Sequence, residues 1–246
     1  MSPHFRRIFF LFFPFFLLAG NSQAQYRAHV KERSLSWIGF ITQVKLKKGW
    51  ILLADVHHRR DEFMANPNFY IIRTGLGKSL PRNHMVAAGV AHMWLSTSAQ
   101  GEHFFTDENR IYEQWSHTSK WGKINFLQRF RNEQRWQQTV VNGQKTGYNR
   151  FSNRFRYLVQ WTFPLSKNTY VPSLVLADEA MWQVGKDIAH NQFDQNRIFL
   201  GIKQKVTSSL QFDFGYMNLR QQKPDGINWD NNHILRLFLY YQPHRD

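Results

Sequence analysis

The chain has 246 residues, a formal net charge of +15 and no cysteine. The absence of cysteine excludes a disulfide framework, a thiolate metal site, a cysteine nucleophile and a lipidated N-terminal cysteine. The excess of arginine and lysine favours either an acidic partner or ion pairs within the fold. No linker or change in composition divides the chain, so we expect one domain.

The first 24 residues are predicted to form a secretory signal peptide. Arg6 and Arg7 supply a short basic region, residues 8–19 are apolar apart from Pro14, and Ser22-Gln23-Ala24 places small residues at the positions that signal peptidase recognises. The apolar run is shorter than the roughly 20 residues that a membrane helix needs. We therefore expect cleavage after Ala24 and an exported domain over residues 25–246, without a transmembrane helix.

The stretch 124–136 shows the pattern that organises the rest of the chain. Its even positions are mostly apolar, as at Phe126, Phe130 and Trp136, whereas its odd positions include Arg131 and Glu133. Successive side chains of a strand point to opposite faces, so this strand has one apolar and one ionic face. In a membrane barrel the apolar face points outward to lipid and the ionic face lines the interior.

The same alternation recurs along the chain, in segments of about ten residues separated by turn signals. The aromatic content of 16% fits an outer surface that meets lipid, and alternation explains why the mean hydropathy is only −0.53. The segments predicted as strands cover residues 35–46, 50–60, 69–80, 84–96, 108–117, 123–136, 153–164, 170–182, 194–206, 210–220 and 232–242.

These segments predict an all-β fold, a closed antiparallel up-and-down transmembrane β-barrel. Membrane barrels normally have an even number of strands, so we expect about twelve, with a short extra strand within residues 26–33, or ten as the alternative. Residues 97–107 and 137–148 are expected to be longer loops. If the C-terminus is periplasmic, the strand over 35–46 also runs toward the periplasm.

An ionic network is predicted in the interior of this barrel, because the charged positions of several strands share one face. Arginine suits such a place, since its planar guanidinium pairs with carboxylates and stays charged. The interpretations are a network that fills and stabilises the lumen, an anion path or a site for a phosphorylated or carboxylated ligand, and catalysis. The predicted members are Glu108, Arg110, Arg129, Arg131, Glu133, Arg135, Arg154, Arg156, Glu179 and Arg197.

Two other functions compete with a structural or transport role. A lipid-modifying hydrolase on a small barrel would need a serine, a histidine and an acid or amide, but no motif orients a nucleophile. His57 and His58 are adjacent and therefore face opposite ways on a strand, so they do not form a metal site together. A soluble periplasmic barrel that holds an acidic ligand would have to hide apolar faces such as Phe155, Val159 and Trp161.

Ten motifs resemble a family of predicted bacterial outer-membrane barrels, domain of unknown function 2490. The resemblance extends from Trp37 to Tyr241. Its motifs are Trp-Ile-Gly-Phe at 37–40, Lys-Gly-Trp at 48–50 leading to Arg59, Glu-Asn-Arg-Ile-Tyr-Glu-Gln at 108–114, Gln-Arg-Phe-Arg-Asn-Glu-Gln-Arg at 128–135, Arg-Phe-Arg-Tyr at 154–157, Phe-Pro-Leu at 163–165, Asp-Glu at 178–179, Phe-Asp-Gln-Asn-Arg at 193–197, Gly-Tyr-Met-Asn at 215–218 and Asn-His-Ile-Leu at 232–235.

The resemblance implies a barrel in the outer membrane of a Gram-negative envelope, but it implies no activity and no cofactor. The expected partners are lipopolysaccharide, the barrel-insertion machinery and an envelope protein, rather than nucleic acid. Such barrels often end on an aromatic residue, whereas here residues 242–246 follow Tyr241. We expect the last strand to stop at Tyr241, with a short tail after it.

Overall fold

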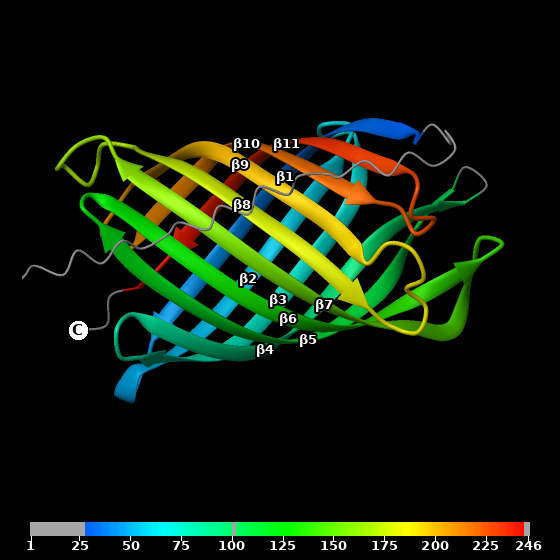
Figure 1. Cartoon of the computed structure of the whole chain (residues 1–246), viewed down its shortest axis with the longest axis horizontal. Coiled ribbons are helices and arrows are strands. Elements are labelled where there is room, and N and C mark those ends of the chain that lie inside the picture. The colour runs from blue at the N-terminus through cyan, green and yellow to red at the C-terminus, as the bar shows by residue number, and fades with distance from the viewer. Residues whose placement is uncertain (1–27, 100–101, 244–246) are drawn as a thin grey trace, which may run out of the picture.

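A computed structural model describes residues 28–99 and 102–243, which form a β-barrel (Figure 1). The predicted signal peptide and the last three residues lie outside this part. Among the described residues no helix is long and apolar enough to cross a membrane. One short 3₁₀ helix, η1 (Lys47–Gly49), follows the first strand. The strands are β1 (Val30–Lys45), β2 (Trp50–Asp61), β3 (Asn66–Leu80), β4 (His84–Ala99), β5 (Glu102–Trp121), β6 (Ile124–Val141), β7 (Gln144–Pro164), β8 (Ser173–Val184), β9 (Phe193–Lys205), β10 (Leu210–Gln222) and β11 (Trp229–Tyr241).

The barrel closes through a parallel seam between β1 and β11, which corrects the prediction of about twelve antiparallel strands. Every other neighbouring pair is antiparallel, and the seam runs from the pair Val30 and Trp229 to the pair Thr42 and Tyr241. An odd number of strands places the first and last in the same direction. Residues 30–33, expected in a separate strand, instead begin β1, and Tyr26 and Arg27 lie outside the described part.

The direction of β1 and the end of β11 agree with the sequence prediction. The strand over 35–46 was expected to run in the same direction as the last strand, and the parallel register of β1 and β11 confirms this. The last strand was expected to stop at Tyr241, where β11 ends.

A hydrogen-bonded turn at residues 225–228 fixes the start of the seam. Asp225 accepts hydrogen bonds from the backbone N–H groups of Asn228 and Ile227, at 2.9 Å each, and from the Asn228 side chain. These bonds hold the pKa of the Asp225 carboxyl below its ordinary value. Asn228 Oδ1 in turn accepts a 3.0 Å hydrogen bond from the backbone of His29, which holds the chain against the turn just before β1.

The two ends of the barrel differ in their connections. One end, here the turn end, carries η1, the tight connections of β3–β4 and β5–β6, and the last residue of β11. The opposite hairpin end carries the extended β6–β7 hairpin, at the right of Figure 1. The expected loops over 97–107 and 137–148 are wrong, because β4, β5, β6 and β7 continue through most of them. Asn142 and Gly143 turn that hairpin with positive φ angles of 50° and 78°, as two-residue hairpins require.

The alternation predicted for 124–136 is present in β6. Arg131, Glu133 and Arg135 are buried in the barrel interior, whereas Phe130 is exposed on the outer wall. The other strands follow the same parity. One feature differs from the expectation of an ionic lumen, because the interior also holds an apolar cluster contributed mainly by β1 and β8–β11. Its buried members are Leu35, Trp37, Val175, Ala177, Phe199, Met217, Leu219 and Ile234.

Candidate functional site

The interior charges of β5, β6 and β7 lie opposite one another because the strand register aligns them. Arg110 faces Arg135 across β5 and β6, and Glu133 faces Arg154 across β6 and β7. Like charges directly opposite each other are unfavourable. Glu108, two residues from Arg110 on the same face, relieves the first of these pairs by binding both arginines.

A balanced set of six charges fills the lumen toward the hairpin end, and we call it the ionic plug. Glu108 Oε1 lies 2.5 Å from Arg110 Nε and 2.8 Å from Arg135 Nε, and the three side chains are 10% exposed or less. The plug has three cations and three anions: Glu108, Arg110, Glu133, Arg135, Arg154 and Asp194.

Arg154 links Glu133 to Asp194, the other two carboxylates of the plug. Its Nη2 lies 2.6 Å from Glu133 and its Nη1 lies 3.1 Å from Asp194. Each plug residue therefore has an oppositely charged neighbour, and buried pairs with this geometry are costly to break on one side only. Asp194 was not among the predicted residues, although it lies in the motif at 193–197.

Arg156 connects the plug to Glu179, a carboxylate deeper in the lumen. Its Nη1 lies 2.7 Å from Glu133, and its Nη2 lies 2.8 Å from Glu179. Glu179 also lies 2.8 Å from Arg129 Nη2 and 3.4 Å from Arg197 Nη1. One carboxylate is thus shared among three guanidinium groups, which leaves this level of the lumen with more cations than anions.

Arg131 completes the set of ten predicted residues, but its main partner is neutral. Its Nε and Nη2 donate to Gln114 Oε1 at 3.0 and 2.6 Å, and Glu133 is 3.7 Å from its Nη1. All ten predicted residues therefore lie in one continuous interior network. The structure divides them into a balanced plug and a cation-rich remainder.

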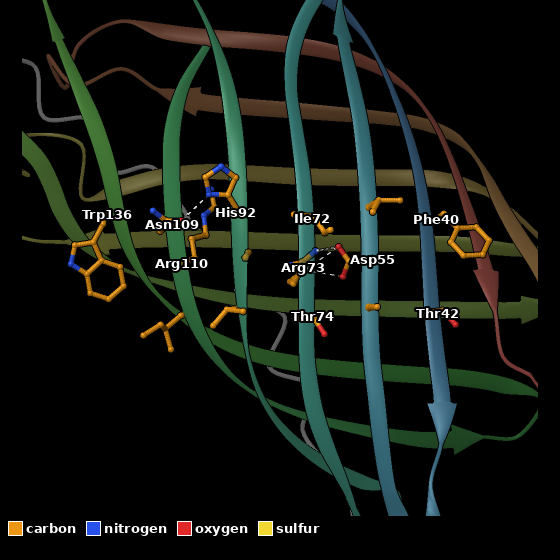
Figure 2. Close-up of a pocket in the computed structure, with 15 residues that line it drawn as sticks. Phe40, Thr42, Asp55, Ile72, Arg73, Thr74, His92, Asn109, Arg110 and Trp136 are labelled. Atoms are coloured by element: carbon orange, nitrogen blue, oxygen red, sulfur yellow. Dashed lines mark hydrogen bonds and ion pairs between the residues drawn. The ribbon is translucent and has the colours of Figure 1, made fainter. Parts of the chain in front are cut away.

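Further interior charges on β2 and β3 were missed by the sequence analysis. Arg73 Nε lies 2.9 Å from Asp55, and His57 Nε2 lies 3.0 Å from the same carboxylate; Figure 2 shows Asp55 and Arg73 paired across the two strands. Their signal was available, since these residues occupy alternate positions opposite the exposed apolar side chains Val56 and Ile72.

Arg59 is the most unusual of these charges. Its side chain is buried, and among the described residues no carboxylate lies within ion-pair distance of it. Its guanidinium carbon is instead 3.4 Å from the centre of the Trp37 ring and 4.4 Å from that of Phe69. Cation–π contacts of this kind supply part of the stabilisation that a carboxylate would give.

A cavity of about 450 Å³ occupies the rest of the lumen, and we call it the chamber. It reaches the turn end, since Asn83 of the β3–β4 turn is in its wall. Among the described residues, the carboxylates in its wall are Asp55 and Glu179, and its apolar wall includes Trp37, Phe199 and Phe238. The cations in the wall are Arg59, Arg73, Arg129, Arg131, Arg156, Arg197, Lys203 and Arg236.

A second hollow, of about 680 Å³, lies along the row of strands β1–β6 (Figure 2). Its lining is mainly apolar and includes Phe40, Ile72 and Trp136. His92 Nδ1 in this hollow is 2.8 Å from Asn109 Oδ1. No serine or threonine hydroxyl of the described residues is hydrogen-bonded to His92, whose Nε2 lies 3.4 Å from Asp107.

No three metal-binding side chains converge anywhere in the described part of the chain. His57 points into the chamber, whereas His58 packs its ring against Tyr70 at 5.0 Å between centres. The site is therefore built from guanidinium groups, carboxylates and aromatic rings. Such a set can hold an anion or fix the barrel wall.

A family described as a protein of unknown function, DUF2490, matches residues 35–232. The chain belongs to the DUF2490 family. This finding confirms the resemblance based on the motifs, and the matched DUF2490 span includes the whole ionic plug together with Arg59 and Glu179. No curated protein and no solved structure matches the chain. The DUF2490 family has no defined function, so the function is argued from the interior residues of the barrel.

Proposed function

We propose that this DUF2490 protein is an outer-membrane β-barrel, exported by a cleaved signal peptide, whose lumen is blocked by the ionic plug at one end and hollow at the other. The observation that carries the proposal is the exposure of large apolar side chains in the middle of the strands. Val90 is 53% exposed and Leu200 is 52% exposed, each flanked by interior-facing neighbours. Monomeric soluble proteins rarely expose apolar surface over a whole wall.

Aromatic side chains toward both ends of the outer wall support this location. Trp50, Trp121 and Tyr241 lie at the turn end, and Trp94 lies toward the hairpin end. Aromatic girdles of this kind flank the apolar band of outer-membrane barrels, where rings meet the lipid headgroups. An ionic interior together with an apolar outer surface is the arrangement typical of membrane barrels.

The turn end is proposed to face the periplasm, because the long strands β5, β6 and β7 extend at the hairpin end and outer-membrane barrels have their longer extensions on the extracellular side. In this orientation the chamber opens to the periplasm and the plug closes the extracellular side. Such a lumen suits a binding or structural role better than free diffusion, since all six plug residues are buried. Lipopolysaccharide around the barrel and the insertion machinery at β11 are the proposed partners.

Fractionation of a cell that produces the chain tests this proposal. We expect the protein in the outer-membrane fraction, and we expect faster gel migration before boiling than after it, because closed barrels resist unfolding by detergent. A variant with the hairpin charges Lys145 and Arg150 replaced by glutamine serves as a control and keeps both properties. Recovery as a soluble periplasmic protein would contradict the proposal and favour a soluble barrel.

A further inference from the structure

The chamber has an imbalance of charge that the plug lacks. The plug pairs three cations with three carboxylates, whereas the chamber wall has eight cations and two carboxylates. Two further carboxylates contact cations of the wall: Asp213 lies 3.1 Å from Arg236, and Glu133 of the plug lies 2.7 Å from Arg156. The cations still outnumber the carboxylates. If these charges only stabilised the barrel interior, we would expect cations and carboxylates in equal numbers, because buried unpaired charge is costly.

Several cationic groups in the chamber have donors with no acceptor. The Nε atoms of Arg59, Arg129 and Arg236 are buried, and no described residue accepts a hydrogen bond from them. Lys203, in the same wall, has no carboxylate of the described residues within ion-pair distance. Guanidinium groups bind carboxylates and phosphates through short, charge-assisted hydrogen bonds, so a wall with this excess of cations suits an anion.

The other part of the chamber wall is apolar. Trp37, Phe199, Met217 and Phe238 belong to or pack against the interior apolar cluster, and all four line the cavity. Arginine also lies against these rings, with the Arg236 guanidinium carbon 3.3 Å from the centre of Phe199. The chamber therefore offers positive charge and an apolar surface within one space.

We propose that the chamber binds a small amphiphilic anion, in which a carboxylate or phosphate group is attached to an apolar body. The charged group contacts guanidinium groups of the chamber wall, among them Arg59, and the apolar body lies against the aromatic wall. The ligand enters from the turn end, because the plug fills the other end. This inference goes beyond the membrane location, since the chamber is inside the barrel wherever the barrel resides.

Calorimetric titration of the full chain in an uncharged detergent tests the ligand class. Phenyl phosphate is the probe, and benzoate tests the carboxylate form. Inorganic phosphate, which has only the anionic group, and phenol, which has only the aromatic ring, are the controls. We expect phenyl phosphate or benzoate to bind at least about tenfold more tightly than either half. Absence of binding by both, or equal binding of inorganic phosphate, would overturn the proposal.

Variants of the chamber test the site itself. Arg59→Met is expected to weaken binding about tenfold while the melting temperature holds or rises, because Arg59 has no carboxylate partner to leave unpaired. Arg131→Leu is the second variant, since its hydrogen bonds go to neutral Gln114. Arg60→Met is the matched control, because Arg60 hydrogen-bonds Met64 and Ala65 in the exposed β2–β3 turn.

The ionic strength provides an independent readout. Binding to the chamber should weaken when salt is added, although less steeply than for an exposed site.

If Arg60→Met weakens binding as much as Arg59→Met and Arg131→Leu do, the anion is held by general surface charge and the proposal is wrong.

Discussion

Replacing Glu133 with glutamine is expected to lower the free energy of unfolding by about 3–5 kcal/mol. The Glu133 carboxylate is 2.6 Å from Arg154 and 2.7 Å from Arg156, with Arg110 and Arg131 within 3.7 Å, and its side chain is 1% exposed. Glutamine keeps the volume but removes the charge, so the cations stay buried with one partner fewer. Reversible urea unfolding of the folded barrel in lipid measures the change.

The matched control for this substitution is Glu32→Gln on the outer wall. The Glu32 side chain is 59% exposed and accepts hydrogen bonds from Asn231 and His233, so its replacement should change stability by no more than about 0.5 kcal/mol. A Glu133→Gln loss as small as the Glu32→Gln loss would show that the plug does not stabilise the barrel.

Replacing Leu200 with arginine is expected to cost about 2–4 kcal/mol in a bilayer, the cost of a cation on the lipid face near the midplane. Leu200 is on the outer wall in the middle of β9, with Leu176 and Tyr216 beside it on the neighbouring strands. The bilayer offers no partner for the guanidinium there, whereas water would solvate it at little cost. Urea unfolding in lipid vesicles, compared with the parent chain, measures the difference.

Leu165→Arg is the control for the lipid-face substitution. Leu165 lies in the connection between β7 and β8 and is 66% exposed, so arginine there should be nearly neutral. If Leu200→Arg and Leu165→Arg have the same small effect, the outer wall faces water, and the soluble-barrel alternative gains support.

The alternation of side chains made the barrel predictable from the sequence. In β6 and β7 the charged interior residues recur at every second position, so Arg131, Glu133 and Arg156 could be assigned to one face. In β9 the run Ile198-Phe199-Leu200 is apolar without a break. Hydropathy alone therefore could not show that Phe199 belongs to the interior, and the apolar half of the chamber was missed.

The parallel pairing that closes the barrel could not be predicted from the sequence pattern either. Whether β1 pairs with β11 depends on the number and register of all the strands, and no local signal records it. The hairpin extensions of β4–β7 resemble loops in sequence because polar residues, Gly101 and the Asn142-Gly143 pair interrupt the alternation there. Asp55 and Arg73 are single charges in strands that are otherwise mostly apolar or neutral in their middle, so they form no run of alternating charges like that of β6.

Contact between the outer wall and lipid decides whether this barrel spans a membrane. The chain has no cysteine, so single cysteines at Ile198, Leu200 and Ile202 can be spin-labelled in vesicles and compared with one at the chamber residue Gln160. We predict high accessibility to oxygen and low accessibility to a water-soluble nickel complex at the three β9 positions, and the reverse at Gln160. High accessibility to the nickel complex at all three β9 positions would contradict the account.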